Sequence, residues 1–391
     1  MAAMEKNNKN LNVPNLRFPE FSGEWDITTI GEISNIKNGP FGSVLHAEDY
    51  VSDGIPIVTT EHFKSGSLPI VKDGIPQVSE QDYIRLKGYK LQTNDIVISR
   101  VGSVDINAYV SDTQNGWLFS GRVLRVRPIS SVNSLCLHFV LSTEKVKQGI
   151  RSRAVGQTMP SINTPILSTT NIFLPKSLEE QRKISIFLAL IDARLETQKK
   201  IIEDLKKLKD AIRAKLFRHI ESTCSVYDEI RNMLDYEQPS EYLVNSTEYS
   251  DNYQTPVLTA NKAFILGYTD ETYGIYAKGD CIILDDFTMD VKYVTFPFKV
   301  KSSAIKILIA KQHVDLYFMY EYLLYLGLVS EEHKRHYISE IEPMNIVSPP
   351  LETQKHIALT LQTISRKIEN ATSFYGLLSK QKQYLLNQLF I

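Results

Sequence analysis

The chain has 391 residues, of which 43% are hydrophobic and 23% are charged. This balance is typical of a globular protein and excludes a disordered or collagen-like chain, while no run of about 18 apolar residues predicts a membrane-spanning helix. The formal net charge of −1 excludes a strong overall attraction to nucleic acid. The cysteines Cys136, Cys224 and Cys281 share no metal-ligand spacing and suit a reducing compartment, so we expect a cytoplasmic protein.

The first part of the chain is predicted to be a tail followed by a globular domain. Residues 1–20 begin with a polar stretch that lacks the apolar core of a signal peptide, and we predict a short flexible tail there. Residues 21–175 are predicted to form a first domain of mixed α and β structure. Short apolar segments at 56–61, 94–98 and 123–127 are typical of buried strands, and 135–141 is predicted to be a helix.

Residues 176–220 are predicted to form one long helix. Ser177 and Glu180 have the spacing of a capping box at its start. Apolar residues then recur at steps of three and four, which is the period of a coiled-coil seam. The predicted seam residues are Ile184, Leu188, Ile191, Leu195, Ile202, Leu205, Ile212 and Leu216.

A second globular domain is predicted at residues 221–349. Its segments 256–261 and 279–283 resemble 56–61 and 94–98, further strands are predicted at 292–296 and 304–309, and 317–326 is predicted to be a helix. Residues 222–350 hold 10 Lys and Arg against 19 Asp and Glu. Because phosphate binding needs clustered cations, any nucleic-acid surface here is a local patch, or a partner supplies the positive field.

A second long helix is predicted at residues 350–391, with Pro349-Pro350 marking its start. Its seam residues are Ile357, Leu361, Ile364, Ile368, Leu378, Leu385 and Leu389. Its start, Leu351-Glu352-Thr353-Gln354, repeats Leu178-Glu179-Glu180-Gln181 at an offset of 173 positions, and the register holds to the end of the chain. Each helix either packs on its own domain or packs on the other helix. The matched length and phase favour an antiparallel coiled coil joining two related domains, with approximate twofold symmetry in a mixed α/β (α+β) fold.

Motifs for catalysis are absent, so we expect no catalytic residue and no metal site in this chain. The sequence has no phosphate-binding loop, no GxGxxG and no Asn-Pro-Pro-aromatic segment. Asp285, Asp286 and Asp290 with Lys292 loosely resemble a metal-dependent nuclease core, although an acidic surface loop explains them better. His333 to His336 form a basic cluster that suits a phosphate better than a metal. A nuclease or methyltransferase with its own recognition domains, and a coiled-coil adaptor that binds only protein, remain as alternatives.

The order of these pieces resembles the specificity subunit of type I restriction–modification systems. The resemblance is carried by the repeated Leu-Glu-x-Gln-x-x-Ile helix starts and the offset between them. Four shorter motifs add to it: Leu16-Arg17-Phe18-Pro19-Glu20-Phe21, Gly31-Glu32-Ile33, Ser99-Arg100-Val101-Gly102 and Met159-Pro160-Ser161-Ile162. The second domain departs from this pattern, with Leu284-Asp285-Asp286-Phe287 and Tyr337-Ile338-Ser339-Glu340 in the corresponding places.

The resemblance implies a non-catalytic subunit with two target-recognition domains that together read a bipartite site in double-stranded DNA. It further implies that the helices set the separation of the two domains and bind two modification (methyltransferase) subunits. Restriction subunits, which are motor–nucleases, would join in some systems. S-adenosylmethionine, ATP and Mg²⁺ would then be used by the partner subunits, with no cofactor in this chain.

Residue chemistry selects candidate DNA contacts in the loops that flank the strands. Arg, Lys, Asn and Gln suit base edges, while Ser and Thr suit phosphates. In the first domain the candidates are Lys37, Ser43, Thr59, Arg100, Arg151, Arg153, Gln157 and Thr158. In the second they are Thr259, Asn261, Lys262, Lys292, Lys334, Arg335 and His336.

Overall fold

The computed structural model describes residues 12–40, 45–259, 264–329 and 336–391. The chain divides into two compact units: unit 1 comprises Met1–Thr197 and Tyr375–Ile391, and unit 2 comprises Gln198–Phe374. Each unit consists of a globular domain, called domain 1 or domain 2, and one part of each of the long helices α6 (Leu178–Thr223) and α9 (Leu351–Leu389). Within the described ranges, no helix has the length and apolarity needed to cross a membrane.

Domain 1 consists of small antiparallel sheets with short helices. One four-stranded sheet has the order β2-β9-β6-β7, another has the order β3-β5-β4-β8, and β1 pairs with β10. The β4–β8 pair is the parallel exception. The strands are β1 Asp26–Thr29, β2 Ser34–Asn38, β3 Tyr50–Val51, β4 Ile55–Val58, β5 Gln77–Val78, β6 Ile96–Ser99, β7 Asn107–Tyr109, β8 Leu118–Phe119, β9 Val123–Pro128 and β10 Asn171–Leu174. The α-helices are α1 Ile30–Ile33, α2 Glu80–Arg85, α3 Ser134–Leu141, α4 Glu144–Arg151 and α5 Thr164–Ser168.

Domain 2 repeats this plan with its own strands. Its four-stranded sheet has the order β12-β18-β15-β16, its three-stranded sheet has the order β14-β13-β17, and β11 pairs with β19. The strands are β11 Tyr227–Glu229, β12 Leu234–Glu237, β13 Thr255–Leu258, β14 Ile265–Thr269, β15 Cys281–Asp285, β16 Val291–Val294, β17 Lys299–Val300, β18 Ile305–Ala310 and β19 Asn345–Val347. The helices are α7 Ile230–Met233 and α8 Leu316–Leu326, with a π-helical turn at Tyr337–Ile341.

The strand registers show which residues of the two domains correspond. Ser120 N donates to Val58 O at 2.9 Å, and Lys301 N donates to Leu258 O at the same distance. The parallel pairs β4–β8 and β13–β17 therefore match, as do the segments 56–59 and 256–259 that the sequence paired.

The sequence pairing of 94–98 with 279–283 is off by one inside the strand. Ile96 and Ile98 face the core beneath α3, and their counterparts beneath α8 are Ile282 and Leu284. A slip of one residue reverses every face of a strand, so burial fixes the match. It pairs Ser99 with Asp285 and Arg100 with Asp286.

The repeated glutamine of the two helix starts joins each long helix to its domain. Gln181 Oε1 accepts the backbone N–H of Asn133 at 2.8 Å, and Gln354 Oε1 accepts that of Asp315 at 2.9 Å. Their Nε2 groups donate to Pro175 O and Pro349 O at 2.8 and 2.9 Å. Asn133 and Asp315 are the N-caps of α3 and α8, so both units contain the same buried joint.

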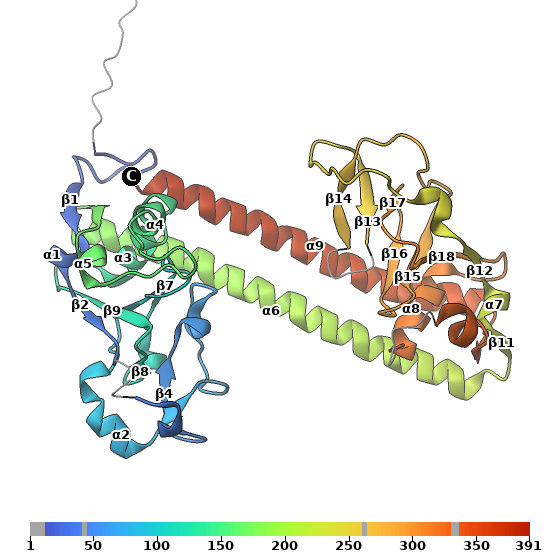
Figure 1. Ribbon diagram of the computed structural model, residues 1–391, viewed down its shortest axis with the longest axis horizontal. Helices are drawn as coiled ribbons and strands as arrows, with labels where there is room; N and C mark the ends of the chain where they lie inside the picture. The colour runs from blue at the N-terminus through green and yellow to red at the C-terminus, as the bar shows by residue number, and fades with distance from the viewer. Residues whose placement is uncertain (1–11, 41–44, 260–263, 330–335) are drawn as a thin grey trace, which may run out of the picture. The chain divides into compact units, whose positions relative to one another are not determined.

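Helices α6 and α9 pack antiparallel within each unit, as predicted. In unit 2, Gln198 Nε2 donates to Ala371 O at 3.1 Å, and in unit 1 Lys382 forms an ion pair with Asp192. The predicted seam residues are all buried or half-buried. In unit 1, Leu188 lies in one core with residues of helix α9 and of domain 1. Helix α6 therefore packs on the other helix and on its own domain at the same time. Figure 1 shows the red end of α9 beside α4 in this unit.

The predicted tail of residues 1–20 is packed from residue 12 onward, while residues 1–11 lie outside the described ranges. Leu16 N donates to Gln388 O at 2.9 Å, and Arg17 binds both carboxylate oxygens of Glu180 at 2.7 and 2.8 Å. The predicted capping box is therefore half formed, because Ser177 Oγ accepts Glu180 N while the Glu180 carboxylate turns to Arg17 and Trp25. The N-terminal motif thus contacts both long helices in unit 1, α9 through Leu16 and α6 through Arg17.

Candidate nucleic-acid interface

Two separate sequence motifs of domain 1 meet at the ends of β6 and β9. Gly102 N donates to Pro160 O at 2.8 Å, and Ile162 N donates to Arg100 O at 2.9 Å. Arg100 N in turn donates to Arg122 O at 2.9 Å. The residues 99–102, 120–122 and 155–162 consequently form one surface, which we call the arginine surface.

Two arginines give this surface its positive charge. Arg100 is half-buried, and its Nη1 donates to Gly121 O at 3.2 Å. Arg122 is exposed, and its side chain makes no hydrogen bond or ion pair to the residues that the structure describes. Sequence reasoning missed Arg122; its position in the turn between strands β8 and β9 is the signal that would have found it.

A hollow of about 490 Å³ adjoins the arginine surface. It is lined by Pro40, Leu45, Tyr50, Thr59, Thr60, Glu61, Ser120, Gly121 and Arg122. Gly39 is required beside it, since a Cβ there would lie 1.9 Å from Ser120 O. The Asn38–Pro40 turn is thus held close to the protein backbone.

The other predicted residues of domain 1 fall into two groups. Gln157 and Thr158 are exposed on the hairpin that belongs to the arginine surface, and Thr59 lines the hollow beside it. Three basic side chains make contacts within the protein instead. Lys37 donates to Gly88 O at 2.7 Å, Arg151 forms ion pairs with Asp105 and Glu144, and Arg153 donates to Gly149 O at 2.9 Å. Ser43 lies outside the described residues.

Domain 2 has a buried carboxylate in the place of Arg100. Asp286 N donates to Ala304 O at 3.0 Å, which is the bond that Arg100 makes to Arg122 in domain 1. The Asp286 carboxylate is 1% exposed and accepts His336 N at 2.9 Å and Tyr337 N at 2.7 Å. Where domain 1 joins its two motifs through main-chain bonds, domain 2 joins them through an aspartate.

The acidic residues Asp285 and Asp286 of domain 2 therefore stabilise the turn in which they lie. Asp285 Oδ1 accepts the N–H groups of Phe287 and Thr288, both at 2.8 Å. Lys306 Nζ lies 3.2 Å from Asp286 Oδ2. Over the described ranges, no three His, Cys, Asp or Glu side chains are grouped as a metal ion would require.

The predicted contact residues of domain 2 are only partly placed. Thr259 is half-buried at the end of β13, and Lys292 is exposed on the edge strand β16. His336 is buried, and its Nδ1 lies 2.8 Å from Glu340 Oε2. Asn261, Lys262, Lys334 and Arg335 lie outside the described residues.

The model of the type I restriction modification DNA specificity domain matches residues 22–207 and 233–373. The chain belongs to this family. Within it, this specificity chain is 40% identical over 167 residues to the EcoR124I/EcoR124II specificity subunit of Escherichia coli, covering 39% of the chain and 41% of that relative. It is 26% identical to the putative MjaX specificity subunit of Methanocaldococcus jannaschii over 95% of the chain and 93% of the relative.

Solved structures share the fold of this specificity chain. The type I restriction–modification S subunit from M. genitalium superposes with a TM-score of 0.66 at 16% identity, covering 97% of this chain and 99% of that chain. A structure from a study of complex assembly and conformational transition of the type I system gives 0.56 at 14% identity, covering 94% and 97%. Both likenesses are evidence for the fold.

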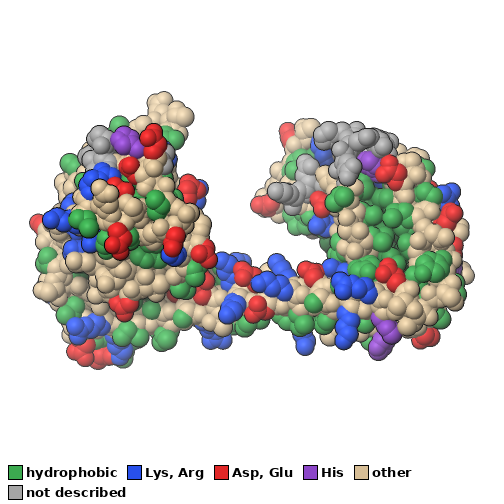
Figure 2. Space-filling view, turned by 90° about the horizontal axis from the view of Figure 1, so that it is seen from below, with side chains coloured by type: hydrophobic (Ala, Val, Ile, Leu, Met, Phe, Trp, Pro, Cys, Tyr) green, Lys and Arg blue, Asp and Glu red, His purple; other side chains and the backbone are tan. Residues whose placement is uncertain are grey.

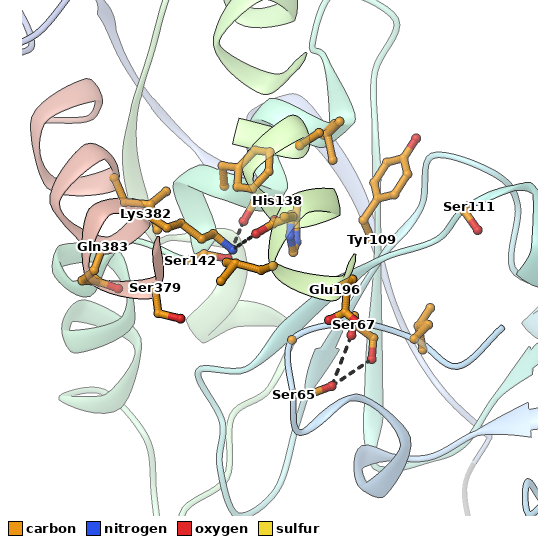
Figure 3. A pocket seen from close by; sticks show the side chains of 18 of the residues that line it. Ser65, Ser67, Tyr109, Ser111, His138, Ser142, Glu196, Ser379, Lys382 and Gln383 are labelled. Carbon is orange, nitrogen blue, oxygen red and sulfur yellow. Dashed lines mark hydrogen bonds and ion pairs between the residues drawn. The ribbon is translucent and has the colours of Figure 1, made fainter. Parts of the chain in front are cut away.

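A larger cleft of about 530 Å³ lies in unit 1 of the specificity chain, where domain 1 faces its parts of α6 and α9. Figure 3 shows Lys382 reaching toward His138 and Ser142. The Lys382 ammonium is paired with Asp192 and lies 5.7 Å from the Phe139 ring centre. Burial, with Lys382 and Lys147 nearby, lowers the pKa of His138 to about 3, so the ring is neutral at pH 7. His138 therefore adds no charge to the cleft.

The long helices of the specificity chain carry exposed apolar residues at repeated positions. Ile186 and Leu359 are both 59% exposed and are 173 residues apart, which is the offset of the helix repeat. Ile201 and Phe374 form a second such pair. Figure 2 shows Lys and Arg side chains on the helical segment in view, with hydrophobic side chains among them. A sequence scan for the seam alone passes over these residues, because they lie outside the heptad positions.

Proposed function

We propose that this chain is the DNA-reading subunit of a type I restriction–modification complex, in which each domain reads one half of a bipartite site in double-stranded DNA. The observation that carries the proposal is the arginine surface, where the two family-like motifs of domain 1 join and present the free guanidinium of Arg122. A guanidinium suits both a guanine edge and a phosphate. Domain 2 keeps a four-stranded sheet and a parallel strand pair and changes the loops, as two domains with different target sequences would.

We further propose that this chain is not catalytic and that its partners supply the chemistry. S-adenosylmethionine would be used by modification subunits, and ATP and Mg²⁺ by restriction subunits where these are present. The hydrogen bonds of Asp285 and Asp286 support this proposal. Both carboxylates accept backbone N–H groups of a turn or a loop, and carboxylates used in this way are poor metal ligands. A cytoplasmic location suits the three free cysteines.

Replacing residues 222–350 by the second domain of another family member tests the proposed reading. We expect only one half of the methylated sequence to change, because domain 1 and its arginine surface stay intact. The measurement is methylome sequencing of cells that express the hybrid with the modification partner. A control hybrid keeps the native domain 2 and carries the same junctions. An altered sequence in both halves, or no methylation by either hybrid, would contradict modular reading.

Two modification subunits would bind the two repeated apolar surfaces around Ile186 and Leu359. The internal repeat supports this occupant, since one chain presents the same kind of surface twice and so suits two copies of one partner. We expect Ile186→Asp and Leu359→Asp each to reduce the complex to one modification subunit, and the double variant to bind none. Native mass spectrometry of the purified complexes counts the copies.

Leu208→Asp is the matched control for these two variants. Leu208 is 50% exposed on α6, but its repeat equivalent is the polar Gln381. The control complex should keep two modification subunits. Two copies bound to the double variant would place the docking surface elsewhere.

A further inference from the structure

Domain 2 lacks both cations of the arginine surface. The strand registers pair Arg100 with Asp286 and Arg122 with Ala304, which is 4% exposed. Residues 222–350 also carry nine more acidic than basic side chains. If domain 2 binds DNA on the corresponding face, its phosphate contact lies at a different position from that in domain 1.

Asp286 cannot take this part. Its carboxylate accepts two backbone N–H groups and has Lys306 at 3.2 Å, all within the core of the domain. Lys306 is 3% exposed, and its Nζ donates to Tyr236 Oη at 3.1 Å. This network balances its own charge and leaves no cation for an external anion.

Five of the seven Lys and Arg residues that the structure describes in domain 2 are paired with carboxylates. These pairs are Arg231 with Glu229, Lys278 with Glu237, Lys299 with Glu271, Lys306 with Asp286 and Lys311 with Asp235. Among the described residues from 224 to 350, Lys292 and Lys301 are the ones without such a pair. Only Lys301 follows directly on the β13–β17 edge that corresponds to the hollow of domain 1.

Lys301 occupies the position that Ser120 holds in domain 1. Its backbone N–H donates to Leu258 O at 2.9 Å, so it lies beside Thr259 as Ser120 lies beside Thr59. The side chain is exposed, and Nζ is 5.6 Å from the ring centre of Tyr249. Lys301 thus places a positive charge on this edge of domain 2. Its counterpart Ser120 lies two residues before Arg122, which carries the positive charge in domain 1.

We propose that Lys301, together with Thr259, binds a backbone phosphate of the second half-site, the part that Arg122 plays at the first. This inference rests on the proposed function, which it extends to a named contact in domain 2. Ammonium and hydroxyl groups are ordinary phosphate partners and carry no base information by themselves. Lys301 therefore contributes affinity and position, while other residues select the sequence.

The test uses the complex of the full chain with its modification partner and two fluorescent duplexes, one with the site found by methylome sequencing and one unrelated. Affinities are measured between 50 and 200 mM salt for Lys301→Ala, Lys301→Arg and Arg122→Ala. We expect Lys301→Ala to weaken binding to both duplexes alike and to lower the salt slope by about one. The loss of affinity across this salt range then shrinks about four-fold relative to the parent. Lys301→Arg should restore the slope.

Lys311→Ala is the matched control, because Lys311 lies past the opposite end of β18 and pairs with Asp235 at 3.5 Å. It should leave the slope unchanged, and equal melting temperatures would exclude a folding defect. An unchanged slope for Lys301→Ala with a lowered slope for Arg122→Ala would overturn this inference and leave the proposed function standing. A Lys301→Ala complex that methylates a different second half-site would also overturn it, in favour of base reading. If the parent complex does not prefer its own site, the proposed function itself fails.

Discussion

Leu188→Asp and Leu361→Asp are expected to lower the free energy of unfolding of the chain by about 4 kcal/mol or more each. Both leucines are completely buried: Leu188 lies in the core that domain 1 shares with helices α6 and α9, and Leu361 lies in the corresponding core of unit 2. Each change removes a packed side chain, which costs about 2–5 kcal/mol, and buries a carboxylate without a partner. Urea unfolding followed by circular dichroism measures the loss.

Leu190→Asp is the control for this prediction. Leu190 lies two residues beyond Leu188 on the same helix but is 66% exposed. Its replacement should change the unfolding free energy by less than about 0.5 kcal/mol. Equal midpoints for Leu188→Asp and Leu190→Asp would show that the packing of α6 described here is wrong.

Glu321→Ala is expected to destabilise unit 2 by about 3–5 kcal/mol. Glu321 of α8 is fully buried, and its carboxylate lies 2.6 Å from Lys209 and 2.7 Å from Arg213, both on α6. Removing it leaves two cations, 12% and 13% exposed, without their shared partner. Denaturant unfolding of the variant measures the effect, and Glu352→Ala, which breaks an exposed pair with Lys355, should cost less than about 1 kcal/mol.

Domain 1 indicates how this loss is repaired. Six residues after the N-cap, α8 has Glu321 and α3 has Phe139, so the same position is ionic in one unit and aromatic in the other. Glu321→Phe combined with Lys209→Met and Arg213→Leu should recover most of the stability, because a buried ion cluster is replaceable by apolar side chains of similar volume. A single Glu321→Ala variant as stable as the parent would mean that the three charges do not fasten domain 2 to α6.

The long helices were predictable because their signal is local and periodic. The heptad positions and the repeated Leu-Glu-x-Gln start are visible in the sequence, and burial of Leu188 and Leu361 follows from them. Strands β6 and β9 of domain 1 and β15, β16 and β18 of domain 2 were also found, since they are short apolar runs between turns, whereas β2, β7 and β12 of the same sheets were not predicted. The exact correspondence of β6 with β15 was not found, because an extra residue after Gly279 shifts the strand by one and only burial reveals the shift.

The candidate interface was less accessible to sequence reasoning. Arg122 and Lys301 are candidates because neither side chain is paired with a carboxylate of the described residues. Such pairing depends on which side chains the fold brings together. The same limit explains why Lys37 and Arg151, equally basic, turn out to bind within the protein. The assignment of individual residues to bases or phosphates stays a prediction for every candidate in both domains.

The glutamine joints have a consequence for building hybrid proteins. Gln181 and Gln354 each offer a donor and an acceptor from one amide, and both bonds end on main-chain atoms. Because these hydrogen bonds involve only main-chain atoms of the domain, they do not depend on its side chains. To form this joint, a foreign domain that ends at Pro175 or at Pro349 has to keep the proline carbonyl and present one backbone N–H at the N-cap of its own helix. The most permissive splice points for engineering new specificities therefore lie at these prolines rather than inside the helices.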